Sequence, residues 1–296
     1  VVELQPEVPT PYKDLGRALL HGHPTAQQAQ QAIAYLQKAI SLIGESTPEM
    51  ISRMSLGDTI TLEAEAMSML AEAYAETGEL QQSQAVYRQV LDDQVAQKSG
   101  WRSRLALGFS QVAIKLDQPE TALAVLKEAL QKEPENISLK QALADAYMAN
   151  GLAQDAYDHA RRVIEEQPVE LETVTWFIHL GNQLRKHPGS VRTLIQADMT
   201  RLLQNAIQSE PARADLLVQL GKLLIEKGER QQALDVFNKL ADLDLKDWQI
   251  EATDLYLAGK SIREWGDAPL SVYLLEEAIE KSRFGQVSFS GVFPAL

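Results

Sequence analysis

His21 and His23, on either side of Gly22, are the histidines in this sequence whose spacing most resembles that of a metal-binding pair. Imidazole is a common metal ligand, and close histidines hold a metal when further ligands complete the set. No carboxylate cluster lies near them, and Gly22 and Pro24 are typical of a turn. His179 could face a groove, but we interpret it as a surface or partly packed residue. The histidines therefore predict no metal site.

Paired carboxylates are the other candidates for chemistry, at Glu165-Glu166 and Glu276-Glu277. Two carboxylates can divide acid–base catalysis between them. Both pairs have apolar neighbours at helical spacing, which indicates solvated helix faces. The sequence has no Gly-rich phosphate loop, zinc-protease helix, nucleophile elbow, dinucleotide fingerprint or cysteine. We predict that the protein is not an enzyme and that it binds no cofactor and no metal.

Composition limits the classes of partner. The chain has 296 residues, of which 45% are hydrophobic, so a packed core is expected. There are 41 acidic and 28 basic side chains, giving a net charge of −13, and such a surface repels nucleic acid. No apolar run reaches the roughly 20 residues that span a bilayer, so we expect no membrane insertion.

A repeat of 34 residues organises the sequence. Ala122 and Ala156 are 34 residues apart (156 − 122), and so are Pro134 and Pro168 (168 − 134). Each period contains two segments with helical apolar spacing, a short turn such as the one at Gly151, and a closing Pro. The elements are therefore helical hairpins that stack on their neighbours and share a continuous core.

The motif resembles the tetratricopeptide repeat, a helix–turn–helix unit of about 34 residues. Residues 103–136 depart from the family pattern at Ala113, where Tyr is usual, and at Asp117, where Gly is usual. Residues 214–247 have Leu245 where Pro is expected. The match is closest in residues 137–170, through Leu143, Ala144, Tyr147, Gly151, Ala156 and Pro168.

The resemblance implies an all-α, right-handed superhelical solenoid of about seven hairpins over residues 1–282. The segment His187 to Ser190 is the expected break inside the longest unit. Residues 283–296 leave the repeat, and we expect a short extended segment there or the start of a missing region. Because the chain begins with Val1 instead of Met, we expect a processed product or part of a longer protein. The units lie near residues 10–44, 58–97, 101–136, 137–170, 171–211, 214–247 and 248–282.

In the family that this sequence resembles, the first helices of the hairpins line a groove that binds a partner. The known clamp for a C-terminal carboxylate is not matched, because Gln141 and Asp145 stand where Lys and Asn would be needed. The groove is expected to be acidic toward its N-terminal end and basic toward its C-terminal end. The residues that we expect to bind a partner are Asn182, Lys222, Tyr256, Lys260 and Arg263.

These basic residues predict an acidic or carboxylate-bearing segment as the ligand. The alternative is that they only balance neighbouring acids, namely Glu226, Glu251 and Glu264. We interpret the chain as a protein–protein interaction scaffold that binds a peptide or a folded partner. A further hypothesis is that it is a component of a larger assembly. The competing hypothesis is a sensor or regulatory arm of a larger signalling or enzymatic protein. The sequence does not identify the compartment, and we favour the cytoplasm.

Overall fold

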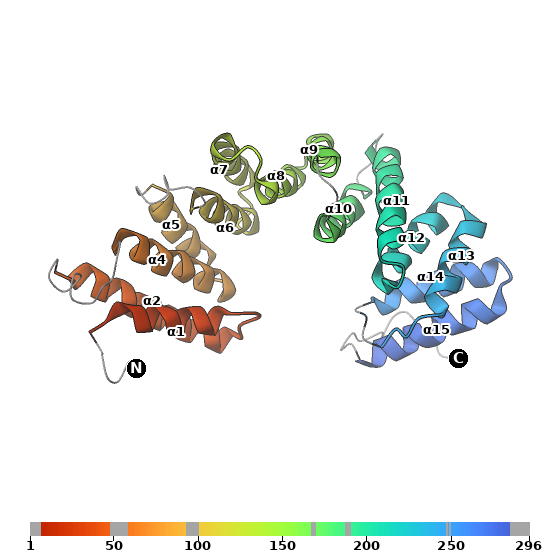
Figure 1. Ribbon diagram of the computed structural model, residues 1–296, viewed down its shortest axis with the longest axis horizontal. Coiled ribbons are helices and arrows are strands. Elements are labelled where there is room, and N and C mark those ends of the chain that lie inside the picture. Colours follow the sequence, from red (N-terminus) through yellow and green to blue (C-terminus); the bar gives the residue numbers. More distant parts are fainter. Residues whose placement is uncertain are drawn as a thin grey trace. The chain divides into compact units, whose positions relative to one another are not determined.

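The computed structural model describes residues 7–47, 59–92, 101–166, 170–186, 191–246, 248 and 250–284. Within these ranges the chain forms fourteen α-helices and no strand (Figure 1). Consecutive helices pack in pairs, so the prediction of an all-α helical repeat is confirmed. The chain divides into two compact units, Val1–Glu166 and Gln167–Leu296, a division that the sequence did not indicate.

The first unit contains four hairpins. They are α1 (Pro9–Leu20) with α2 (Ala26–Glu45), α4 (Thr59–Glu76) with α5 (Leu80–Leu91), α6 (Trp101–Lys115) with α7 (Pro119–Lys132), and α8 (Ile137–Ala149) with α9 (Ala153–Glu166).

The second unit contains three hairpins. They are α10 (Leu171–Leu184) with α11 (Val191–Ser209), α12 (Ala214–Lys227) with α13 (Arg230–Ala241), and α14 (Ala252–Glu264) with α15 (Ala268–Phe284). The break expected at His187 to Ser190 lies outside the described residues. So does most of the extended segment expected at residues 283–296. Its first two residues, Arg283 and Phe284, are helical instead and end α15. None of the helices in the described ranges is long and apolar enough to cross a bilayer.

Five hairpins share one turn, which places a left-handed residue after the first helix. Gly78, Gly151, Gly228 and Gly266 have φ between 72° and 91° there. Asp117 occupies the same place with φ 58° and is the one non-glycine residue of the described chain with positive φ. In each turn the next amide N–H donates to a carbonyl five residues back, as Gln118 does to Ala113 at 2.9 Å. Asp117 therefore departs from the family pattern in sequence but keeps its geometry.

Small residues allow the two helices of a hairpin to approach closely. Ala122 and Ala156 are fully buried, as their place in the repeat predicts. In α12, a Cβ atom added to Gly221 would lie 2.4 Å from the ring of Phe237 on α13. The core thus depends on pairing a small residue on one helix with a large one on the other.

Candidate functional site

The first helices of the second unit carry a cavity of about 220 Å³. Its wall is contributed by α10, by α12 and by the beginning of α14. Ile178, Leu216, Val218 and Ile250 supply the apolar part, and the polar part consists of Thr175, His179, Asn182, Asp215, Gln219, Glu251 and Asp254. Apolar walls with a few polar groups are typical of binding sites.

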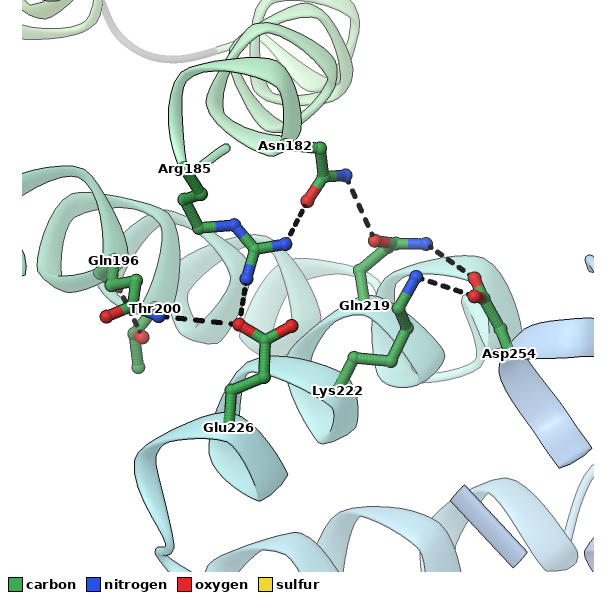
Figure 2. A network of polar contacts seen from close by, with 8 residues as sticks. All are labelled: Asn182, Arg185, Gln196, Thr200, Gln219, Lys222, Glu226 and Asp254. Atoms are coloured by element: carbon green, nitrogen blue, oxygen red, sulfur yellow. Dashed lines mark hydrogen bonds and ion pairs between the residues drawn. The ribbon is translucent and has the colours of Figure 1, made fainter. Parts of the chain in front are cut away.

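A chain of polar contacts crosses this face from one hairpin to the next (Figure 2). Asn182 of α10 donates to the side-chain oxygen of Gln219 on α12 at 3.4 Å. Gln219 in turn donates to Asp254 of α14 at 3.5 Å. Asp254 also accepts from Lys222 at 2.7 Å, and both side chains of this ion pair are largely buried. The contacts fix the amides and carboxylate that line the cavity.

Arg185, the residue that follows α10, extends the network on its other side (Figure 2). It donates to Asn182 at 2.5 Å and forms an ion pair with Glu226 of α12. Gln196 of α11 contacts the same Glu226 carboxylate at 3.4 Å. Arg185 is mostly buried, and its Nε atom has no hydrogen-bond acceptor among the described residues. This arginine therefore links α10 to α12 while it positions Asn182.

The structure places the five candidate residues in two groups. Asn182 and Lys222 belong to the polar network, where they contact other residues of the chain. Lys260 and Arg263 are exposed on α14 and form no ion pair within the described ranges, while Tyr256 on the same helix is partly buried. Lys260 and Arg263 are therefore exposed and unpaired within the described residues, whereas Lys222 is already paired with Asp254.

The alternative that the sequence left open, that the basic residues only balance acids of the same chain, holds for Lys222. Its partner is Asp254, which is not one of the three acids suggested, and Glu226 instead pairs with Arg185. Arg185, Gln219 and Asp254 were not predicted from the sequence as site residues. Their roles depend on how successive hairpins are placed, and spacing within one repeat carries no signal for that.

The remaining carboxylates of the cavity differ in how fully they are neutralised. Arg213 donates to both oxygens of Asp215, at 2.8 and 2.6 Å. Glu251 is exposed at the N-cap of α14, and its side chain accepts no capping hydrogen bond from the helix. Within the described residues no ion pair or side-chain hydrogen bond involves this carboxylate, which is one of the groups that line the cavity.

Comparison with known families supports what the geometry shows. Two tetratricopeptide repeat models match the sequence, one at residues 113–172 and the other at residues 64–92 and 214–247. The chain contains tetratricopeptide (TPR) repeats. The matched residues lie in both compact units.

Solved structures with a similar fold include a TPR protein. A TPR protein from Parabacteroides merdae is 14% identical, with 86% of this chain and 91% of that chain covered and a TM-score of 0.51. The structure described for pilF of Pseudomonas aeruginosa is 14% identical, with 78% and 95% covered and a TM-score of 0.53. At this identity the likeness shows the fold alone. No curated protein sequence matches the chain.

The TPR helices of the first unit carry a second cavity, of about 330 Å³, whose wall includes Arg17, Glu65, Glu72 and Arg104. Lys13 and Arg17 both contact the Glu65 carboxylate, at 2.6 and 3.2 Å. Glu72 lies 3.8 Å from Arg104, and burial raises the pKa of this carboxyl. The sequence predicted an acidic surface here, but in the structure each of these two acids has a basic partner.

Over the described part of the chain, no group of three His, Asp or Glu side chains is arranged to hold a metal ion.

Proposed function

We propose that this TPR chain is a protein–protein interaction scaffold and that it binds a peptide or an extended segment of its partner across α10, α12 and α14. The observation that carries this proposal is the cavity of about 220 Å³ on the face of those three helices. Its amide and carboxylate groups are already fixed by the polar network, so little side-chain freedom would be lost on binding.

The ligand we propose carries an acidic or carboxylate-bearing residue that contacts Lys260 and Arg263 on α14. Both side chains are exposed, and a chain with net charge −13 offers few unpaired cations. Tyr256, one turn before Lys260, supplies an apolar ring with a polar tip. Asn182 and Lys222 contribute indirectly, because they hold Gln219 and Asp254 at the cavity.

The test begins with partners captured on the full chain and identified by mass spectrometry. The affinity of a purified partner is then measured for the Lys260→Ala/Arg263→Ala variant and for a control, Arg192→Ala/Lys239→Ala. The control removes the same charge from exposed positions on the second helices α11 and α13. Two rim contacts contribute about 1 kcal/mol together, so we expect affinity to fall about fivefold in the first variant only.

Salt provides an independent check on the same pair of variants. Affinity of the unmodified chain should fall as salt rises, and the α14 variant should lose most of that dependence. Equal affinity for the unmodified chain and the α14 variant at low salt, with both folded, would place the partner on another surface. The proposal assigns the chain no reaction of its own.

A further inference from the structure

The cavity on α10, α12 and α14 has an uneven charge. Three carboxylates line it, those of Asp215, Glu251 and Asp254, and no Lys or Arg is among the lining residues. Arg213 neutralises Asp215, and Lys222 neutralises Asp254. The charge of Glu251 is not balanced by any side chain that the structure describes. The lining of the cavity therefore includes one unpaired negative charge, although Lys260 and Arg263 further along α14 are positive.

The apolar part of the wall suits a long side chain with a charged end. Ile178, Leu216, Val218 and Ile250 give the cavity an aliphatic surface. Lys and Arg side chains bury their methylene groups against such surfaces and keep the charged end near water or a carboxylate. A carboxylate ligand would instead meet the unbalanced charge of Glu251 here, and like charges repel.

We propose that this cavity receives a Lys or Arg side chain of the bound segment, with its charge against Glu251 and its stem against the apolar wall. This inference rests on the function proposed above and defines the ligand further. The segment then has both signs of charge: a basic residue in the cavity and an acidic residue at Lys260 and Arg263.

Helix geometry sets the distance between the two charges. Glu251 is the N-cap of α14, and Lys260 follows it by nine residues (260 − 251). At about 1.5 Å and about 100° per residue, Lys260 lies about 13 Å further along the helix axis than Glu251 and about half a turn round the helix from it. An extended peptide advances about 3.3 Å per residue, so the basic and acidic residues of the ligand are at least about four positions apart.

A purely structural role for Glu251 makes a different prediction. An acid at a helix N-terminus interacts favourably with the helix dipole, which would affect stability but not recognition. Glu251→Gln therefore separates the two roles, because it changes the charge and keeps the size. Glu276→Gln is the matched control, since Glu276 is an exposed carboxylate on α15, away from the cavity.

The experiment selects random dodecapeptides displayed on phage for binding to the full chain, and then measures the affinity of enriched synthetic peptides. We expect enriched sequences to place Lys or Arg at least about four positions from Asp or Glu. Glu251→Gln should weaken their binding about fivefold, and Glu276→Gln should leave it unchanged.

Two results would overturn the inference in distinguishable ways. Enriched peptides that depend on Lys260 and Arg263 but not on Glu251, or that contain no basic residue, would refute the cationic side chain and leave the proposed function standing. Enriched peptides that respond to none of these changes would place binding elsewhere and refute both.

Discussion

Replacing Asp117 by Gly tests whether the repeat turn explains this part of the fold. Asp117 is exposed, its φ is 58°, and its side chain has no hydrogen bond among the described residues. A left-handed conformation costs an L-residue about 1 kcal/mol or more, and glycine avoids this cost. Glycine also gives the unfolded chain more freedom, which offsets about 0.5 kcal/mol. The net expectation is that Asp117→Gly stabilises the protein by about 0.5 kcal/mol.

The reverse change in the next hairpin, Gly151→Asp, is the matched control. Gly151 has φ 72° in the same turn, so an aspartate there should destabilise by about 0.5 kcal/mol or more. Urea denaturation followed by far-UV circular dichroism should show midpoints that move in opposite directions with an unchanged slope. A lower midpoint for Asp117→Gly would refute the reasoning, since it would mean that the aspartate stabilises the turn.

Three further changes test packing, hydrogen bonding and charge. Ala156→Leu should overpack a fully buried position and lower the free energy of unfolding by about 1–3 kcal/mol in thermal or urea denaturation. Glu276→Gln on the surface should change it by no more than about 0.5 kcal/mol. Equal effects would show that the assumed repeat alignment is wrong. Ser271→Ala should lower the free energy of unfolding by about 1 kcal/mol in the same measurement, because the buried Ser271 hydroxyl donates to a backbone carbonyl of α14 at 2.9 Å. No change would mean that this hydrogen bond contributes nothing to stability. Burial raises the pKa of Glu72, so the folded state binds its proton more tightly than the unfolded chain does, and this group's contribution to stability falls as pH rises from about 4.5 through the raised pKa. Glu72→Gln should therefore raise the urea midpoint more at pH 7 than at pH 4, and the opposite order would show that the ion pair with Arg104 outweighs burial.

The sequence predicts the helical hairpins well because their determinants are local. The turn residues, the buried alanines and the apolar spacing all lie within one period, and the structure has each of them where the repeat requires. Asp117 shows the limit of reading residue types alone, because the position keeps a glycine-like backbone without glycine.

The candidate site is less predictable, because it depends on contacts between periods. Lys222 and Asp254 are 32 residues apart, and their ion pair exists only because α12 packs against α14. Arg185 and Glu226 are 41 residues apart, and α11, which packs against both α10 and α12, brings them together. Helical spacing predicts that Lys222 lies on the face of the first helices, but it does not show which acid on the next helix reaches it. The exposed pair Lys260 and Arg263 stays a prediction that binding experiments must test.

Site-specific photocrosslinking tests the central claim most directly. A benzoylphenylalanine residue at Tyr256 replaces one aromatic ring with another on the proposed binding face, and the same residue at Lys239 lies on α13 as a control. If the partner binds across α10, α12 and α14, a captured partner, or an enriched peptide, should crosslink to position 256 and not to position 239. Crosslinking at position 239 alone, with both variants folded, would contradict it and place the interaction on the second helices.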